Sequence, residues 1–302
     1  MYNKTPDSPS SIYVYSDKGY DENYNIIFNK LDDEIELVLP DDFNESLKQN
    51  SFPENLTSLV FGKYYNQVLT KETLPKNLKY LVLGDSFNKK INPNDLPDTL
   101  ISLTLGKYFN QYLEVGSLPK SLLYLKIGEK FNKDILEKVL PDRLITLEFD
   151  NFSCFQKKIK KNTLPNSIKK LVFGDQFNQK IKPNRLPAEL KYFILGREYL
   201  HDLNNVLPDK VKYLEVGFKF IHRLINIPSS LEIICFDRFD YITIESKTIK
   251  KIIIKNLVNG RKNIEFPDNL EEVQLIKYKL NPEYPLNLNC NLINEYGDII
   301  NL

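Results

Sequence analysis

The sequence contains no tryptophan, two histidines and three cysteines, and its single methionine is Met1. Two histidines are too few for a His-rich metal site or for several histidine-based catalytic centres. The cysteines, Cys154, Cys235 and Cys290, are odd in number, far apart and in no CxxC pair, which argues against a disulfide framework and against a zinc knuckle. We therefore expect free thiols in a reducing compartment.

A long hydrophobic run is also missing. The most apolar short segments, such as Ile252-Ile253-Ile254, lie between lysines and are far too short to cross a bilayer. The first residues, MYNKTPDS, include no apolar region of the kind that a signal peptide needs. We expect an intracellular, cytoplasmic protein without membrane association.

Neither sign of charge is in excess. Lys and Arg total 41 and Asp and Glu total 40, so the formal net charge is +1. This balance excludes a strongly basic protein that binds nucleic acid through its overall charge, and it excludes a protein dominated by an acidic tail. Hydrophobic residues make up 42% and charged residues 27%, which is ordinary for a folded chain, and 302 residues allow one large domain or two smaller ones.

The sequence does contain a repeat, marked by an apolar residue followed by proline. Four successive steps between these prolines are 22 residues long, and the next four are 24, 22, 21 and 20. The prolines are Pro53, Pro75, Pro97, Pro119, Pro141, Pro165, Pro187, Pro208 and Pro228. Pro267 follows after 39 residues, about two shortened turns, one of which keeps its register through Ile249, Ile252 and Ile254.

Each unit carries the same residue types at the same offsets from its proline. After Pro75, Leu81-Val82-Leu83 alternates, which predicts a short strand with the leucines inward and the proline at the bend before it. Gly84 follows, and a glycine repeated at a strand end predicts a turn with positive φ; two units have Asp150 and Asp237 there. In Phe87-Asn88, we expect the ring to fill the core and the amide to bond the neighbouring coil, forming a ladder.

One such unit cannot bury its own apolar face, so the units must stack. We predict a mainly β solenoid of roughly 11–12 coils of about 22 residues, with one short parallel strand per coil and little or no α-helix. Residues 1–29 are expected to form an N-terminal cap, 30–288 the solenoid and 289–302 a C-terminal cap. The coil after Pro141 has two extra residues between Asp150 and Phe155, where we expect a loop bulge and no domain break.

The spacing LxxLxLGxxFNxxI…LP resembles the FNIP repeat family, a short relative of leucine-rich repeats (LRRs) from social amoebae and giant DNA viruses. The resemblance covers most of the chain and implies an LRR-like solenoid, located in the host cell if the chain is viral. The chain departs from the family name because polar residues follow Phe-Asn, and its last coils carry Tyr199-Leu200 and Phe220-Ile221 instead. Many members begin with an F-box that links them to ubiquitin ligases; about thirty residues precede the repeats here, so we do not expect that adaptor role.

The outward face of the strands is the main candidate site. Offsets five and seven after each proline should point away from the core, and they are richer in Tyr, Val and Ile than a solvated surface needs. We predict that this face binds a protein partner, not yet identified, through Val60, Tyr80, Val82, Tyr124, Val172, Tyr192, Ile194 and Tyr213. The alternative is that these side chains serve only strand formation and cross-strand stacking.

Two rival sites are visible. Nucleic acid or an anionic surface could bind a basic cluster of Lys157, Lys158, Lys160, Lys161, Lys169, Lys170, Lys180 and Lys182. Nearby acids such as Asp175 and the neutral overall charge favour a solvated face instead. His201 and His222 share one offset on neighbouring coils, but no third ligand stands out, and we predict no metal or other cofactor.

No motif of a known catalytic class is present. GxSxG, P-loop, HExxH and dinucleotide-binding patterns are all missing from the sequence. The outward acids of the strands, Glu148 and Glu215, are isolated from each other, so a paired acid and base is not evident. We therefore expect a non-enzymatic scaffold with no catalytic residues.

Overall fold

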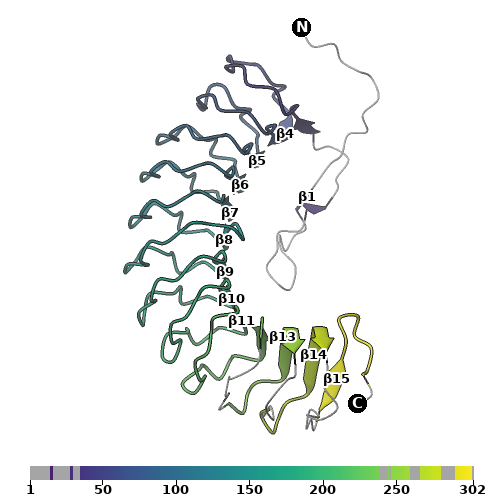
Figure 1. Ribbon diagram of the computed structural model, residues 1–302. Helices are drawn as coiled ribbons and strands as arrows, with labels where there is room; N and C mark the ends of the chain where they lie inside the picture. The colour runs from purple at the N-terminus through teal and green to yellow at the C-terminus, as the bar shows by residue number, and fades with distance from the viewer. Residues whose placement is uncertain are drawn as a thin grey trace. The chain divides into compact units, whose positions relative to one another are not determined.

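The computed structural model describes residues 14–15, 28–29, 35–238, 244, 246–258, 266–279 and 290–300. Within these ranges the chain forms strands, turns and bends, and no helix occurs. It divides into two compact units. The N-terminal unit holds the described residues up to 131 together with 139–146, and the C-terminal unit holds 132–138 together with those from 147 onward. Each unit is a succession of similar coils (Figure 1).

Parallel strands in sequence order form the sheet of the N-terminal unit. They are β3 (Ile35–Val38), β4 (Leu56–Val60), β5 (Tyr80–Val82), β6 (Ser102–Thr104) and β7 (Tyr124–Ile127). Residues 22 apart stand side by side, as Leu81 and Leu103 do. A short antiparallel pair, β1 (Val14–Tyr15) and β2 (Phe28–Asn29), belongs to the predicted N-terminal cap; the rest of residues 1–29 lies outside the described residues.

The sheet of the C-terminal unit follows the same rule. Its strands are β8 (Thr146–Phe149), whose first residue belongs to the N-terminal unit, β9 (Lys170–Val172), β10 (Tyr192–Ile194), β11 (Tyr213–Val216), β12 (Ile233–Phe236), β13 (Lys251–Val258), β14 (Glu272–Lys279) and β15 (Asn291–Ile293). The coil without a proline is present as predicted, because Ile249, Ile252 and Ile254 are fully buried around β13. At 8 residues each, β13 and β14 are longer than the short strand expected in each coil. The predicted LRR-like β-solenoid, with about 11 turns and a spacing of about 22 residues, is confirmed.

In the proline-bearing coils, the strand is preceded by a turn that begins at the repeated proline. The carbonyl oxygen of Pro75 accepts a hydrogen bond from the N–H of Leu78, 3.2 Å away, and the same bond recurs in the other proline-bearing coils. Proline is suited to this place because it fixes φ and has no N–H to offer a ladder. The predicted position of the proline at the bend is therefore confirmed.

The strand-end glycines do not adopt the positive φ that we expected. Among the described residues, positive φ occurs at Gly297 and at a set of residues that each lie three before a proline: Asn50, Asn94, Gly116, Lys138, Asn162, Asn184 and Asn205. The strand-end glycines are required instead by close stacking. A Cβ on Gly106 would lie 1.8 Å from the carbonyl oxygen of Gly84, far inside any van der Waals contact.

The core is a set of columns that run from coil to coil. Strand leucines such as Leu103 and Leu105 are almost fully buried. In the N-terminal unit the rings of Phe43, Tyr65, Phe87, Phe109 and Phe131 are stacked with centroids 5.9 to 6.4 Å apart. In the C-terminal unit Phe155, Phe177 and Tyr199 continue the same pattern, at 6.0 and 6.2 Å.

The amide ladder predicted for the Phe-Asn pairs is also present. In the N-terminal unit the Oδ1 atoms of Asn44, Asn66 and Asn88 each accept a hydrogen bond from the backbone N–H one coil later. In the C-terminal unit the acceptors are Asn132, Gln156 and Asn178, and the ladder reaches Leu200, whose side chain cannot extend it. The ladder thus satisfies backbone groups that the turn leaves without a partner.

The coil after Pro141 contains the predicted loop bulge. Its extra residues form a turn in which Asp150 Oδ1 accepts a hydrogen bond from the N–H of Phe152, and the Phe152 side chain is exposed. The division between the two units falls just before this bulge, although no linker marks it in the sequence. The cap and solenoid boundaries at residues 29, 30, 288 and 289 remain predictions.

Candidate functional site

Side chains at offsets five and seven alternate with the buried leucines along each strand, but those predicted to contact a partner are largely half-buried. The half-buried residues are Val60, Val82, Tyr124, Val172, Tyr192, Ile194 and Tyr213. Tyr80 differs, because it is only 5% exposed. Its neighbours in register, Ser58 and Ser102, are buried as well, so this row is withdrawn from solvent. The prediction that Tyr80 offers an exposed ring was wrong.

In the N-terminal unit the predicted residues do not form a continuous aromatic surface. Tyr80 and Tyr124 stand in one row, but Ser102 separates them. Val60 and Val82 are direct neighbours, and the row then continues with the polar Thr104. The face of this unit is therefore interrupted by small polar side chains.

In the C-terminal unit the predicted residues lie together. Tyr192 of β10 pairs with Tyr213 of β11, and their rings stack with centroids 5.7 Å apart. Val172 of β9 is the direct neighbour of Ile194 in the other row. Two aromatic and two aliphatic side chains thus form one continuous patch, which we call the strand patch.

A polar network holds Tyr213 in place. Its hydroxyl donates a hydrogen bond to Glu215 Oε2 at 2.9 Å, and Lys255 Nζ donates to Glu215 Oε1 at 2.6 Å. Burial, aided by Cys235 and Glu215, raises the pKa of Tyr213 far above its ordinary value, so the phenol stays a neutral donor. Burial and the nearby Glu215 also raise the pKa of the Cys235 thiol to about 12, which makes a thiolate nucleophile unfavourable there.

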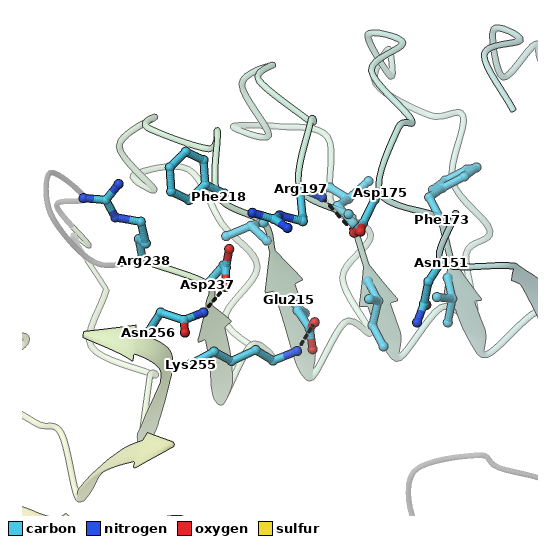
Figure 2. Close-up of a pocket in the computed structure, with 16 residues that line it drawn as sticks. Asn151, Phe173, Asp175, Arg197, Glu215, Phe218, Asp237, Arg238, Lys255 and Asn256 are labelled. Atoms are coloured by element: carbon cyan, nitrogen blue, oxygen red, sulfur yellow. Dashed lines mark hydrogen bonds and ion pairs between the residues drawn. The ribbon is translucent and has the colours of Figure 1, made fainter. Parts of the chain in front are cut away.

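A groove of about 510 Å³ lies at the carboxyl ends of these strands (Figure 2). Val172, Ile194 and Glu215 line it from the strands. The turns that follow the strands contribute Asp175, Arg197, Phe218, Asp237 and Arg238, and β13 adds Lys255 and Asn256. The groove therefore combines an apolar floor with a charged rim.

The rim belongs to a regular series, which we call the rim ladder: the residue directly after each strand-end glycine, or its equivalent in neighbouring coils. In the N-terminal unit this ladder reads Asp41, Lys63, Asp85, Lys107 and Glu129, with the sign of charge alternating at every step. Lys107 and Glu129 form an ion pair, with Lys107 Nζ 3.0 Å from Glu129 Oε2, while the carboxylate of Asp41 accepts a hydrogen bond at 3.0 Å from the backbone N–H of Lys63.

In the C-terminal unit the rim ladder reads Asn151, Asp175, Arg197, Phe218 and Arg238. Phe218 stands where an acid would continue the alternation, between two arginines. Both guanidinium groups lie near its ring, at 5.9 Å for Arg197 and 4.8 Å for Arg238 (Figure 2). Our sequence reasoning overlooked this ladder, although the residue after each glycine would have revealed it.

The two histidines bond to the main chain. His201 Nε2 lies 3.0 Å from the carbonyl oxygen of Asn178, and His222 Nε2 lies 2.6 Å from that of Leu200. Gln67 makes the same type of contact to Asn44 in an earlier coil. Within the described part of the chain no group of three His, Cys, Asp or Glu residues is arranged to hold a metal ion.

The predicted lysine cluster is partly neutralised. Lys170 Nζ lies 3.0 Å from Glu148 Oε1, and both side chains are mostly buried. Lys160 Nζ lies 3.5 Å from Asp134 Oδ1. The described residues contain no helix with the length and hydrophobicity that a membrane span requires.

The FNIP repeat model matches residues 43–86, 65–108, 109–152, 155–198 and 177–219, which together exceed half of the 302 residues. CroV588, a viral protein described as a novel circular LRR structure, is 28% identical with a TM-score of 0.60; the match covers 86% of this chain and 46% of that one. The chain thus spans less than half the length of this relative.

Two more distant structures also match. YopM from Yersinia enterocolitica is 16% identical with a TM-score of 0.41, over 87% of this chain and 71% of that one. A leucine-rich repeat protein from Bacteroides ovatus is 11% identical with a TM-score of 0.21, over 96% and 91%. No curated protein sequence matches the chain. The repeat matches and the coil-by-coil geometry together show that this chain belongs to the FNIP repeat family.

Proposed function

We propose that the chain is a non-enzymatic repeat scaffold that binds a protein partner through the strand patch of its C-terminal unit. The observation that carries this proposal is the continuity of Tyr192, Tyr213, Val172 and Ile194 on adjacent strands. LRR-like repeats generally bind proteins, and tyrosine pairs supply large contact area at a small entropic cost.

Preorganisation supports the same assignment. Tyr213 is fixed by Glu215, and Glu215 is fixed by Lys255, so the aromatic pair needs little ordering when a partner arrives. In the N-terminal unit Tyr80 is buried, and Ser102 and Thr104 interrupt the two rows, so the described strands of that unit offer no comparable patch. We therefore assign the stack of coils in the N-terminal unit a supporting role.

Site-specific photocrosslinking tests the proposal. A benzoylphenylalanine placed at Tyr192 should yield a discrete crosslinked species in extracts of cells that express the protein. The matched control is the same residue at Tyr112, which is 57% exposed in the N-terminal unit and lies on no strand. Crosslinks at Tyr112 equal to those at Tyr192, or none at Tyr192, would contradict the proposal.

A substitution series complements the crosslink. Tyr192→Asp should abolish recovery of the crosslinked partner in a pull-down while the far-UV circular dichroism is preserved, because the ring is half-buried on a face outside the core. Tyr112→Asp should leave recovery unchanged. Equal recovery with both variants would remove the strand patch from consideration.

The rival function is nucleic-acid binding through Lys157, Lys158 and their neighbours. The contacts of Lys170 with Glu148 and of Lys160 with Asp134 reduce the positive charge available to phosphate. A mobility-shift assay with labelled RNA and DNA at low salt separates the two functions. We expect no shift; a shift that disappears with rising salt would favour the rival.

A further inference from the structure

A second groove, of about 880 Å³, lies in the C-terminal unit along the turns that contain Pro208 and Pro228. We call it the proline-turn groove, and none of the residues that line it belongs to a strand. We propose that it binds an extended segment of a partner protein, whose main-chain amides pair with Asn184 and Asn205 and whose basic side chain meets Asp209. This site is separate from the strand patch and adds a second binding surface to the unit.

Two asparagine amides in this groove are free to bond a ligand. Asn184 and Asn205 hold the same place on neighbouring coils, three residues before the repeated proline, and both have positive φ, at 59° and 60°. Both residues are exposed, and neither side-chain amide has a hydrogen-bond partner among the residues that the structure describes. The backbone conformation alone does not select asparagine, since Gly116 and Lys138 adopt it at the same place in other coils.

Other coils offer no such pair at this place. One coil earlier, Asn162 is engaged, because its Nδ2 donates a hydrogen bond to Glu137 Oε1 at 3.3 Å. In the N-terminal unit asparagine alternates with other residues, in the order Asn50, Glu72, Asn94 and Gly116. Two neighbouring asparagines without a partner thus occur where the proline-turn groove lies.

Asp209 adds an unpaired negative charge to the rim of the groove. It directly follows the repeated proline, at a place where the sign of charge alternates in the N-terminal unit: Glu54, Lys76, Asp98 and Lys120. Its neighbours at this place are instead the neutral Ala188 and Ser229. Asp209 is exposed and forms no ion pair within the described ranges. A lysine or arginine of a ligand would supply the missing cation.

The remaining charges of the groove neutralise each other over an apolar floor. Lys210 Nζ donates to Glu189 Oε1 at 2.5 Å, and this hydrogen bond holds the pKa of Glu189 below its ordinary value. Leu186 and Leu207 are buried beneath the rim, and Ile227 is half-buried. The groove therefore combines two free amides and one free carboxylate with an apolar floor.

This combination favours an extended peptide. A carboxamide carries both donor and acceptor groups, as a peptide amide does, so each asparagine can bond main-chain N–H or C=O groups. A helix uses these groups internally, whereas an extended chain leaves them available along its edges. Neighbouring coils are about 4.8 Å apart and an extended chain rises about 3.3 Å per residue, so one short segment reaches both amides.

Nucleic acid fits this groove less well. Phosphates would approach the carboxylate of Asp209, and the one basic residue of the lining, Lys210, is already paired with Glu189. None of the lining residues is aromatic, so the groove has no ring on which a base would stack. The expected ligand is an extended segment that carries Lys or Arg beside an apolar residue.

Selection from a random peptide library displayed on phage tests the proposal on the full chain. Binders to the wild-type protein are counter-selected against the triple variant Asn184→Gly/Asn205→Gly/Asp209→Asn. Glycine accepts the positive φ of both asparagines, so the fold should be retained, which far-UV circular dichroism checks. We expect the surviving sequences to share a Lys or Arg next to an apolar residue. An acidic consensus, a purely apolar consensus, or no enrichment would overturn the proposal.

Fluorescence polarisation with a labelled consensus peptide gives the quantitative test. Asn184→Gly/Asn205→Gly should weaken binding at least about tenfold, because two hydrogen-bonding amides are lost. Asp209→Asn should weaken it about threefold and remove most of its salt dependence. The matched controls Asn94→Gly and Asp98→Asn change the same places in the N-terminal unit and should bind as wild type does. Wild-type affinity in the double glycine variant would contradict the proposal.

The outcomes separate this proposal from the proposed function. Tyr192→Asp should leave the affinity for the peptide unchanged, because the strand patch and the proline-turn groove share no residue. A tenfold loss with Tyr192→Asp would place the peptide on the strand patch and overturn the groove proposal. Displacement of the peptide by spermine at equal affinity would identify a general cation site and overturn it too. Loss of binding confined to the groove variants supports the proposal whether or not Tyr192 crosslinks to a partner.

Discussion

The N-terminal unit repeats its coil with few exceptions, whereas the C-terminal unit departs from the repeat at several positions. In the first, Gly62, Gly84, Gly106 and Gly128 mark every strand end from β4 to β7, and the aromatic column, amide ladder and rim ladder are continuous. Each coil supplies hydrogen-bond and packing partners to the coil beside it. A unit of this kind has little left over to recognise a ligand, and its repeated residues serve stability.

The C-terminal unit uses the same positions differently. Asp150 and Asp237 replace the glycine, Leu200 replaces the ladder amide, and Phe218 replaces an acid of the rim ladder. Asp237 and Phe218 line the groove, next to the strand patch. In a repeat protein, a residue that breaks the pattern without breaking the stack is a candidate for function. Substitutions at matched positions of the two units test whether this difference holds.

Gly106→Ala should have the largest effect. The added Cβ would lie 1.8 Å from the carbonyl oxygen of Gly84, and because the atoms it meets are backbone, no side-chain movement can relieve the clash. We expect a loss above about 5 kcal/mol, with unfolding of the N-terminal unit. Urea denaturation followed by far-UV circular dichroism measures it, because the chain lacks tryptophan.

The matched change in the C-terminal unit is Asp150→Gly, where the chain already accepts a Cβ. It removes the hydrogen bond that Asp150 Oδ1 accepts from the N–H of Phe152, so the loss should be about 1 kcal/mol. Similar denaturation midpoints for Gly106→Ala and wild type would show that close stacking does not require glycine.

Phe109→Ala should have the next largest effect. The ring is fully buried and stacks 6.1 Å from both Phe87 and Phe131, so its removal opens a cavity in the column. We expect a loss of about 3–5 kcal/mol in the same denaturation assay. The control is Phe152→Ala in the C-terminal unit, a ring that is 67% exposed and should change stability by less than about 0.5 kcal/mol. Equal losses would mean that the column does not carry the stability of the coils.

Most of the fold could be predicted from the sequence because each structural role recurs at a fixed offset. The proline at the bend, the inward leucines and the amide ladder each follow from the chemistry of one residue type repeated many times. The glycine failed as a predictor because two physical reasons select the same residue: positive φ and close approach. The structure distinguishes them, because the strand-end glycines have no positive φ and a Cβ on Gly106 would lie 1.8 Å from the carbonyl oxygen of Gly84. The positive φ lies at residues such as Asn94 and Asn184, which recur in the sequence three residues before a proline.

The candidate site could be predicted only in part. Outward orientation follows from alternation along a strand, which placed Tyr192 and Ile194 correctly on the same face. Burial of Tyr80 could not be read from the alternation, because exposure depends on what else covers the face. The groove was missed because it is formed by turn residues such as Arg197 and Phe218, which follow the strands and carry no apolar pattern.

Asn88→Ala should have a moderate effect. Its Oδ1 accepts hydrogen bonds from the N–H of Asn110 at 2.9 Å and from Gln111 Nε2 at 3.1 Å. Loss of this acceptor leaves a half-buried backbone donor without that bond, which costs about 1–3 kcal/mol. Leu200→Ala, at the ladder position of the C-terminal unit, should cost less, since the Leu200 side chain is 43% exposed and accepts no bond. A Leu200→Ala loss as large as that of Asn88→Ala would contradict a stabilising role for the ladder.

Glu129→Gln should have the smallest effect and a distinctive pH dependence. Hydrogen bonds from Lys130 and Lys107 hold the pKa of Glu129 below its ordinary value. A lowered pKa in the folded state contributes stability above the unfolded pKa of about 4.3, and this contribution is lost as the pH falls through the folded pKa. The urea midpoint of the variant should therefore lie slightly below that of wild type at pH 7 and coincide with it in strong acid. High salt should also shrink the difference, because it screens exposed charges.

The corresponding change in the C-terminal unit, Phe218→Gln, exchanges one neutral rim residue for another. It should show no such pH dependence, because no ionised carboxylate of the rim ladder is gained or lost between Arg197 and Arg238. If Glu129→Gln and Phe218→Gln responded to pH in the same way, the alternating charges of the N-terminal unit would not be paired in solution.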